Sequence, residues 1–130
     1  MRLQISLQDG APIYQQIVEQ VKLLVAGGRL KPGDDVAPIR VLAEQLRINP
    51  NTVARAYLEL ERAGLLTMRQ GFGTKVAEGK MALPKREKLR VLAESADVLL
   101  ANARHLNVGL SEVIALLRER DEAMQPEGFK

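Results

Sequence analysis

Residues that could hydrogen-bond to DNA bases are concentrated in one segment, N-P-N-T-V-A-R-A-Y-L-E-L-E-R-A-G, at positions 49–64. If this segment is a helix advancing about 100° per residue, Asn51, Arg55 and Arg62 lie on the side opposite Val53. Asparagine and arginine form paired hydrogen bonds with the edges of adenine and guanine, so this pattern could read a base sequence. The alternative is an ordinary solvated helix face that has no partner.

Further polar residues near this segment are suited to contacts with phosphates or a DNA groove. Arg40 lies near the start of the preceding predicted helix, and Thr52 lies in a first helical turn, where backbone N–H groups also favour phosphate. The stretch R-Q-G-F-G at 69–73 combines a cation, an amide and glycines that permit close backbone approach, which suits a minor groove. Together the candidate DNA-binding residues are Arg40, Asn49, Asn51, Thr52, Arg55, Arg62, Arg69, Gln70 and Gly71.

The segment that carries most of these residues has the marks of a helix with one buried face. Asn49 is a favourable N-cap, Pro50 fits the first helical position, and Gly64 is placed to end the helix. The predicted core face, within about 60° of Val53, is formed by Val53, Ala56, Tyr57 and Leu60.

The surrounding residues predict the elements that would position this helix. Apolar spacing predicts helices over 12–26 and 38–46, and strands over 65–68 and 74–77 joined by the glycine-rich tip. Residues 3–7 alternate as a short strand or an extended arm, and R-L-K-P-G-D-D at 29–35 is predicted to be a turn. Two helices joined by a short turn and followed by a hairpin form a winged helix-turn-helix. We therefore predict a mainly α fold with a small β-hairpin, in which residues 1–79 form a winged DNA-binding domain.

Residues 80–130 are predicted to form a two-helix dimerisation segment with a short tail. Apolar residues recur every three or four positions from about 89 to 103, and Ser111 is a candidate N-cap for a final helix. These helices could fold back on the winged domain or pack against the same helices of a second chain. We favour the homodimer, because the winged domain has enough apolar residues for its own core and the stripe would otherwise stay exposed. The candidate dimerisation residues are Leu89, Leu92, Ala96, Leu99, Leu100, Ala103, Val113, Ile114 and Leu117.

Composition argues against several other classes of protein. The chain has no cysteine, and its one histidine, His105, has no neighbours with which to form a catalytic or metal site, so we expect neither an enzyme nor a cofactor. The net charge is +3, and residues 40–75 hold six basic against three acidic residues, which suits a nucleic-acid partner. No apolar run reaches the roughly 18 residues of a membrane span, and no signal peptide is evident, so a soluble, cytoplasmic protein is expected.

The run from Gly28 to Val76, with the motifs P-I-Y-Q-Q-I at 12–17 and N-P-N-T-V-A-R-A-Y at 49–57, resembles the DNA-binding domain of GntR-type bacterial transcription regulators. The similarity extends over residues 12–77, and these two motifs resemble the short YtrA-like subfamily. The resemblance implies DNA contacts from Arg40, from Asn49, Asn51 and Thr52, and from Gly71, with dimerisation through a C-terminal helix pair. A two-fold dimer would place two recognition helices about one DNA turn (roughly 34 Å) apart, which predicts an inverted-repeat operator. We therefore expect a homodimeric transcription regulator that acts as a repressor.

The chain departs from the family pattern in three places. The chain has Val36-Ala37-Pro38 where L-P-S is usual, which removes a serine N-cap, and Ala54-Arg55 where many relatives have two arginines. Phe72 stands where a basic residue is common. We expect DNA binding with an altered site preference. The alternative function is a winged-helix protein-interaction module without direct DNA binding, and no polar cluster marks a pocket for a small-molecule effector.

Overall fold

The computed structural model describes residues 1–7, 10–71, 73–79 and 82–124. It divides into two units, Met1–Pro84 and Lys85–Lys130, and each is considered by itself. The sequence analysis predicted the boundary between residues 79 and 80. In the described part of the chain, no helix combines the length and apolar character needed to cross a membrane.

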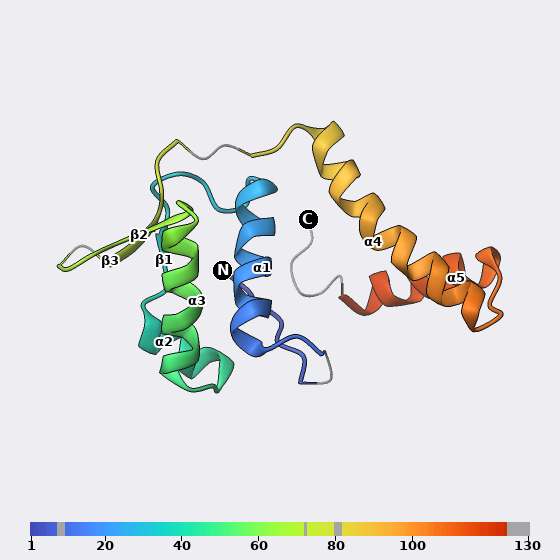
Figure 1. Cartoon of the computed structure of the whole chain (residues 1–130), viewed down its shortest axis with the longest axis horizontal. Helices are drawn as coiled ribbons and strands as arrows, with labels where there is room; N and C mark the ends of the chain where they lie inside the picture. Colours follow the sequence, from blue (N-terminus) through green and yellow to red (C-terminus); the bar gives the residue numbers. More distant parts are fainter. Residues whose placement is uncertain (8–9, 72, 80–81, 125–130) are drawn as a thin grey trace. The chain divides into compact units, whose positions relative to one another are not determined.

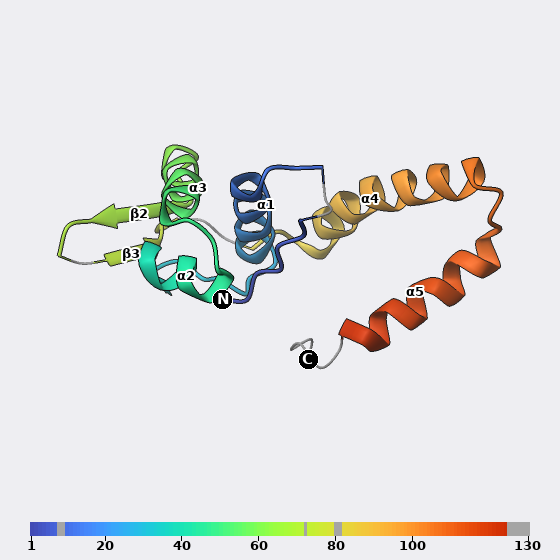
Figure 2. The ribbon, with the colours of Figure 1, turned by 90° about the horizontal axis from the view of Figure 1, so that it is seen from below.

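The described residues of the first unit form three helices and a small sheet, which confirms the predicted winged helix-turn-helix (Figure 1). Its helices are α1 (Ile13–Ala26), α2 (Ile39–Leu46) and α3 (Pro50–Arg62), each within one residue of its predicted start. Its strands are β1 (Asp35–Val36), β2 (Leu66–Arg69) and β3 (Gly73–Val76). Figures 1 and 2 show that β2 and β3 extend as a ribbon away from the three helices.

The sheet has a third strand that the sequence analysis missed. The strand order is β1-β3-β2 with antiparallel pairing, and Asp35 and Val36 lie opposite Lys75 and Thr74. The prediction of a plain turn over 29–35 was wrong in its last residue, because a two-residue strand is too short to show alternation beside Pro32 and Gly33. Lys75 Nζ lies 2.6 Å from Asp35 Oδ1 across this pair.

The core of the first unit lies between α1, α2, α3 and the sheet. The predicted face of α3 is fully buried, with Val53, Ala56, Tyr57 and Leu60 at 0% exposure. Val36 of β1 and Leu66 of β2 close the core on the sheet side. Among the described residues, the cluster comprises Ile17, Val18, Val21, Val25, Leu30, Val36, Leu42, Ala43, Val53, Ala56, Tyr57, Leu60, Leu66 and Val76.

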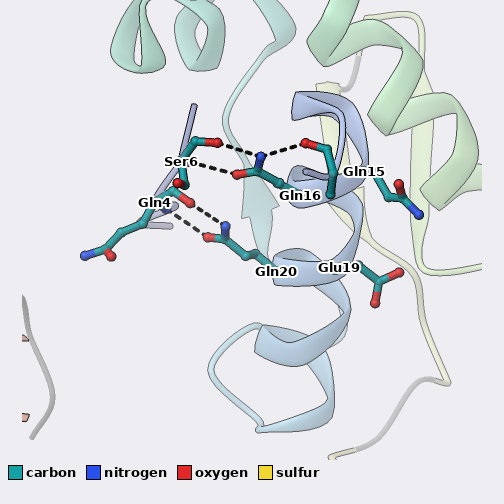
Figure 3. Close-up of a pocket in the computed structure, with 7 residues that line it drawn as sticks. Gln4, Ser6, Gln15, Gln16, Glu19 and Gln20 are labelled. Atoms are coloured by element: carbon teal, nitrogen blue, oxygen red, sulfur yellow. Dashed lines mark hydrogen bonds between the residues drawn. The ribbon is translucent and has the colours of Figure 1, made fainter. Parts of the chain in front are cut away.

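The N-terminal residues form an extended arm held by glutamine side chains of α1 (Figure 3). The Gln16 amide accepts from the backbone N–H of Ser6 at 2.8 Å and donates to the Ser6 carbonyl at 2.9 Å. Gln20 makes the same pair of bonds with the backbone of Gln4, at 2.8 and 2.6 Å. A side-chain amide carries the same donor and acceptor as a peptide group. These glutamines therefore satisfy the backbone N–H and C=O groups of the arm as a neighbouring strand would.

The described residues of the second unit, 85–124, form two helices, α4 (Lys85–His105) and α5 (Leu110–Met124). Asn107, with φ of 60°, lies in the turn between them. Ser111 was wrongly predicted as the N-cap of the last helix: α5 begins at Leu110, because the N–H of Val113 bonds the carbonyl of Gly109 at 3.0 Å and closes the first turn there. The predicted tail beyond Met124 lies outside the described residues.

Candidate nucleic-acid interface

The start of α3 is fixed by its N-cap, as the sequence predicted. Asn49 has an extended backbone, and its Oδ1 accepts from the backbone N–H of Asn51 at 2.8 Å. Pro50 occupies the first helical position. The cap occupies the Asn49 side-chain oxygen, which leaves its amide nitrogen as the group that could donate to DNA.

A buried tyrosine ties α3 to the segment that precedes α2. The Tyr57 hydroxyl donates to the carbonyl of Ala37 at 2.6 Å, and burial raises the pKa of this phenol above its ordinary value. The side chain is 0% exposed, so the bond forms where water does not compete. It holds the beginning of α2 at a set position against the middle of α3.

α2 begins without a side-chain cap and ends in a strained residue. Pro38 occupies the N-cap position and makes no side-chain bond, as expected where a serine is missing. Arg47 adopts a left-handed conformation, φ 57° and ψ 48°, and the N–H of Ile48 then bonds the Ala43 carbonyl at 3.0 Å. This closure makes the turn between α2 and α3. Arg40, the second residue of α2, is exposed.

The outer face of α3 is exposed, and one of its arginines contacts α1. Asn51, Arg55 and Arg62 are solvent-accessible, whereas Thr52 is half-buried. The Arg55 guanidinium carbon lies 3.8 Å from the centroid of the Tyr14 ring. That distance is well within the range of a cation–π contact.

The remaining predicted DNA-binding residues lie at the end of the β2–β3 ribbon. Arg69 ends β2, and Gln70 and Gly71 follow it, all three exposed. Gly71 has φ of 87°, a conformation that side chains with a Cβ rarely adopt, so a glycine is favoured there. Phe72 lies outside the described residues. The structure thus places the nine predicted residues on α2, on α3 with its N-cap, and on the ribbon.

The predicted dimerisation residues divide into buried, half-buried and exposed groups. Ala103 and Val113 are buried, at 7% and 3% exposure, where α4 and α5 meet in the same chain. Leu89 and Leu92 are more than half exposed, at 55% and 61%, and Ile114 and Leu117 are exposed as well. Ala96 is exposed, and Leu99 and Leu100 are half-buried.

Two features of the winged unit were not found by sequence reasoning. The contact of Tyr14 with Arg55 was not predicted, because it joins positions on separate helices that periodicity does not relate. Gln16 is buried at 7% exposure because of its bonds to the arm. A glutamine on the apolar side of a predicted helix was the available signal for that role.

The comparisons with known proteins agree with this geometry. Residues 13–76 match the family model described as "Bacterial regulatory proteins, gntR family". The HTH-type transcriptional repressor YtrA of Bacillus subtilis is 35% identical over 117 residues, which are 90% of this chain and 90% of that repressor. This chain belongs to the GntR family of bacterial regulatory proteins.

Two solved structures are also similar to this GntR-family chain. YtrA from Sulfolobus acidocaldarius, a GntR-family transcription factor, aligns with a TM-score of 0.54 and 35% identity over 74% of this chain and 97% of that one. The DNA-binding domain of AraR, solved in complex with operator ORX1, aligns with a TM-score of 0.53 and 27% identity. That match covers 59% of this chain and 99% of the AraR domain. The predicted YtrA-like identity is confirmed, and the protein is a DNA-binding transcription regulator rather than an enzyme.

Proposed function

We propose that this regulator is a repressor that binds an inverted-repeat operator as a homodimer, with α3 in the major groove and the β2–β3 ribbon beside a minor groove. The observation that carries the proposal is the exposed polar face of α3, which lies opposite a fully buried core face. That arrangement keeps Asn51 and Arg55 out of the core and accessible on the first turns of the helix, where recognition helices meet base edges.

The proposed contacts divide into base readout and phosphate positioning. Arg55 suits the O6 and N7 acceptors of guanine, and Asn51 suits the N6 and N7 of adenine. Thr52 and Arg40 suit phosphates, as does the amide nitrogen of Asn49. Arg62, Arg69, Gln70 and Gly71 would extend the contact along the backbone and into the minor groove. Phosphate contacts would make the affinity fall steeply as salt rises.

The homodimer is proposed from the uncovered apolar side chains of α4 and α5. Leu89, Leu92, Ile114 and Leu117 remain exposed although the two helices already contact each other at Ala103 and Val113. Large apolar side chains exposed on a protein surface often mark a site that a partner covers. A second copy of the pair is the partner that supplies a matching surface, and two-fold pairing predicts a two-fold operator.

The sign of regulation is proposed from the relative that matches nine-tenths of the chain. That relative is named a transcriptional repressor, and the match spans both the winged unit and the C-terminal pair. The AraR domain solved with its operator supports DNA binding by the winged fold itself.

Selection from a random double-stranded DNA library tests this proposal. Wild type, Arg55→Ala and Arg104→Ala would be run in parallel at physiological salt, with Arg104 as an exposed control arginine in the second unit. We expect wild type and the control to enrich the same inverted repeat, and Arg55→Ala to lose preference at one position in each half-site. The cost should be about 1–3 kcal/mol of specific binding. Enrichment of single half-sites would contradict the dimer, and the absence of enrichment would contradict operator recognition.

A further inference from the structure

The contact between Arg55 and Tyr14 joins the predicted base-reading face to a different helix. Arg55 is the sixth residue of α3 and Tyr14 the second residue of α1. The two helices lie side by side in both views (Figures 1 and 2). The guanidinium carbon lies 3.8 Å from the ring centroid, so the cation is stacked on the tyrosine face.

Tyr14 is suited to act as a fixed platform. Its side chain is half-buried and packs against the buried core cluster. Two residues further along α1, the Gln16 amide donates to the carbonyl of Ala11 at 3.0 Å and to that of Ser6 at 2.9 Å, which fixes the chain entering this helix. Packing against the core therefore supports the ring that Arg55 contacts.

Arg55 has little else to orient it. It is exposed, and among the described residues it takes part in no ion pair. A long arginine side chain that is free in solution loses rotamer entropy when it binds. A guanidinium stacked on a ring loses part of that freedom in advance, while its in-plane N–H groups remain able to donate to a base.

We propose that Tyr14 is a positioning residue for base readout: its ring holds the Arg55 guanidinium in an orientation ready to meet a guanine edge. Tyr14 itself contributes to specificity through Arg55 and needs no contact with a base. This inference rests on the proposed function, because it requires that Arg55 reads the operator.

A double-mutant cycle on the full chain tests the inference. Tyr14→Leu and Tyr14→Phe would each be made with Arg55 present and with Arg55→Ala, and each variant's thermal midpoint would confirm that it is folded. Affinities would be measured for the operator selected by wild type and for that operator changed at the base pair whose preference depends on Arg55. The phenylalanine variant keeps the aromatic ring and removes only the hydroxyl.

With Arg55 present, we expect Tyr14→Leu to lower operator affinity by about two- to tenfold, the cost of ordering one long side chain on binding. It should weaken the same base preference as Arg55→Ala, and Tyr14→Phe should retain both affinity and preference. With Arg55→Ala, the leucine substitution should have no further effect.

Three results would overturn the inference while leaving the proposed function intact. These are an equal loss from Tyr14→Leu in both backgrounds, a gain in affinity from Tyr14→Leu, and a loss from Tyr14→Phe as large as that from Tyr14→Leu. The first result would mean that Tyr14 acts through packing of the winged unit and not through Arg55. The second would mean that the ring holds Arg55 away from DNA, and the third that the Tyr14 hydroxyl carries the effect. A wild-type protein that selects no operator would overturn the proposed function and this inference with it.

Discussion

The two units of this chain bury their apolar residues to very different extents. In the part of the winged unit that the structure describes, fourteen buried residues form one cluster, drawn from α1, α2, α3, the sheet and the α1–β1 connection. In the C-terminal pair, only Ala103 and Val113 are buried among the described residues, while Leu89 and Leu92 remain more than half exposed. Burial of apolar surface is the main source of folding free energy. The winged unit therefore has a core sufficient to fold alone, whereas the helix pair buries little apolar surface by itself and would gain stability from the partner surface of the proposed homodimer.

Removal of the helix pair should produce the largest effect on DNA binding. A chain ending at Pro84 keeps the bond from the Leu83 N–H to the Ala26 carbonyl and should unfold cooperatively as a monomer. Its affinity for the full inverted repeat should fall about 100-fold or more, because the second half-site no longer binds intramolecularly. Mobility-shift titration on full and half operators would measure this. An unfolded truncation would contradict the independence of the winged unit.

Truncating one leucine in each unit should separate core packing from assembly. Leu60→Ala empties space in a fully buried site and should destabilise the winged unit by about 2–5 kcal/mol. Leu92→Ala should instead lower the thermal midpoint in a manner that depends on protein concentration, because the proposed homodimer would share the affected surface between two chains. Calorimetry over a range of concentrations would distinguish them. A concentration-independent effect of Leu92→Ala would favour packing within one chain.

Tyr57→Phe should have a moderate effect confined to the winged unit. Loss of the bond to the Ala37 carbonyl should cost about 0.5–1.5 kcal/mol near neutral pH. Burial raises the pKa of Tyr57 above that of an unfolded tyrosine, which is about 10. The stabilisation that comes from this difference in pKa is fully present below about pH 10, the pKa of an unfolded tyrosine, and is lost as the pH rises toward the folded-state pKa. Wild type should therefore lose stability above about pH 10 faster than Tyr57→Phe in chemical unfolding. Tyr14→Phe is the matched control.

The smallest expected effect concerns the ion pair between Lys75 and Asp35. Both side chains are largely accessible to water, so Asp35→Asn should cost at most about 1 kcal/mol, and less at high salt. Urea unfolding at two salt concentrations would measure the change. A larger, salt-independent loss would mean that the winged unit depends on this pair as well as on its core.

Much of the winged unit could be predicted because its signals are local. The Asn49-Pro50 start of α3, its buried face from Val53 to Leu60, and the exposure of Asn51 and Arg55 all follow from helical periodicity and capping. The features that were missed connect distant positions. β1 becomes a strand only through pairing with β3, and the stack of Arg55 on Tyr14 requires two helices to be packed first.

The role of the C-terminal pair could be predicted only in part, for a different reason. Periodicity indicates which residues share a helix face, and it did not separate Ala103 and Val113, which pack within the chain, from Leu89 and Leu92, which do not. That distinction depends on where the turn around Asn107 brings α5 against α4.

The most direct test of the dimeric account is sedimentation of Leu92→Glu beside Ala101→Glu. Both changes add one carboxylate to α4, but Ala101 lies about 180° around the helix from Leu92 and is exposed. We expect Leu92→Glu to be a folded monomer that binds the inverted repeat weakly, because an unpaired charge is costly to bury in an apolar interface. Ala101→Glu should remain a dimer with wild-type affinity. A Leu92→Glu protein that sediments as a dimer, or a wild-type protein that is monomeric on and off its operator, would contradict the account.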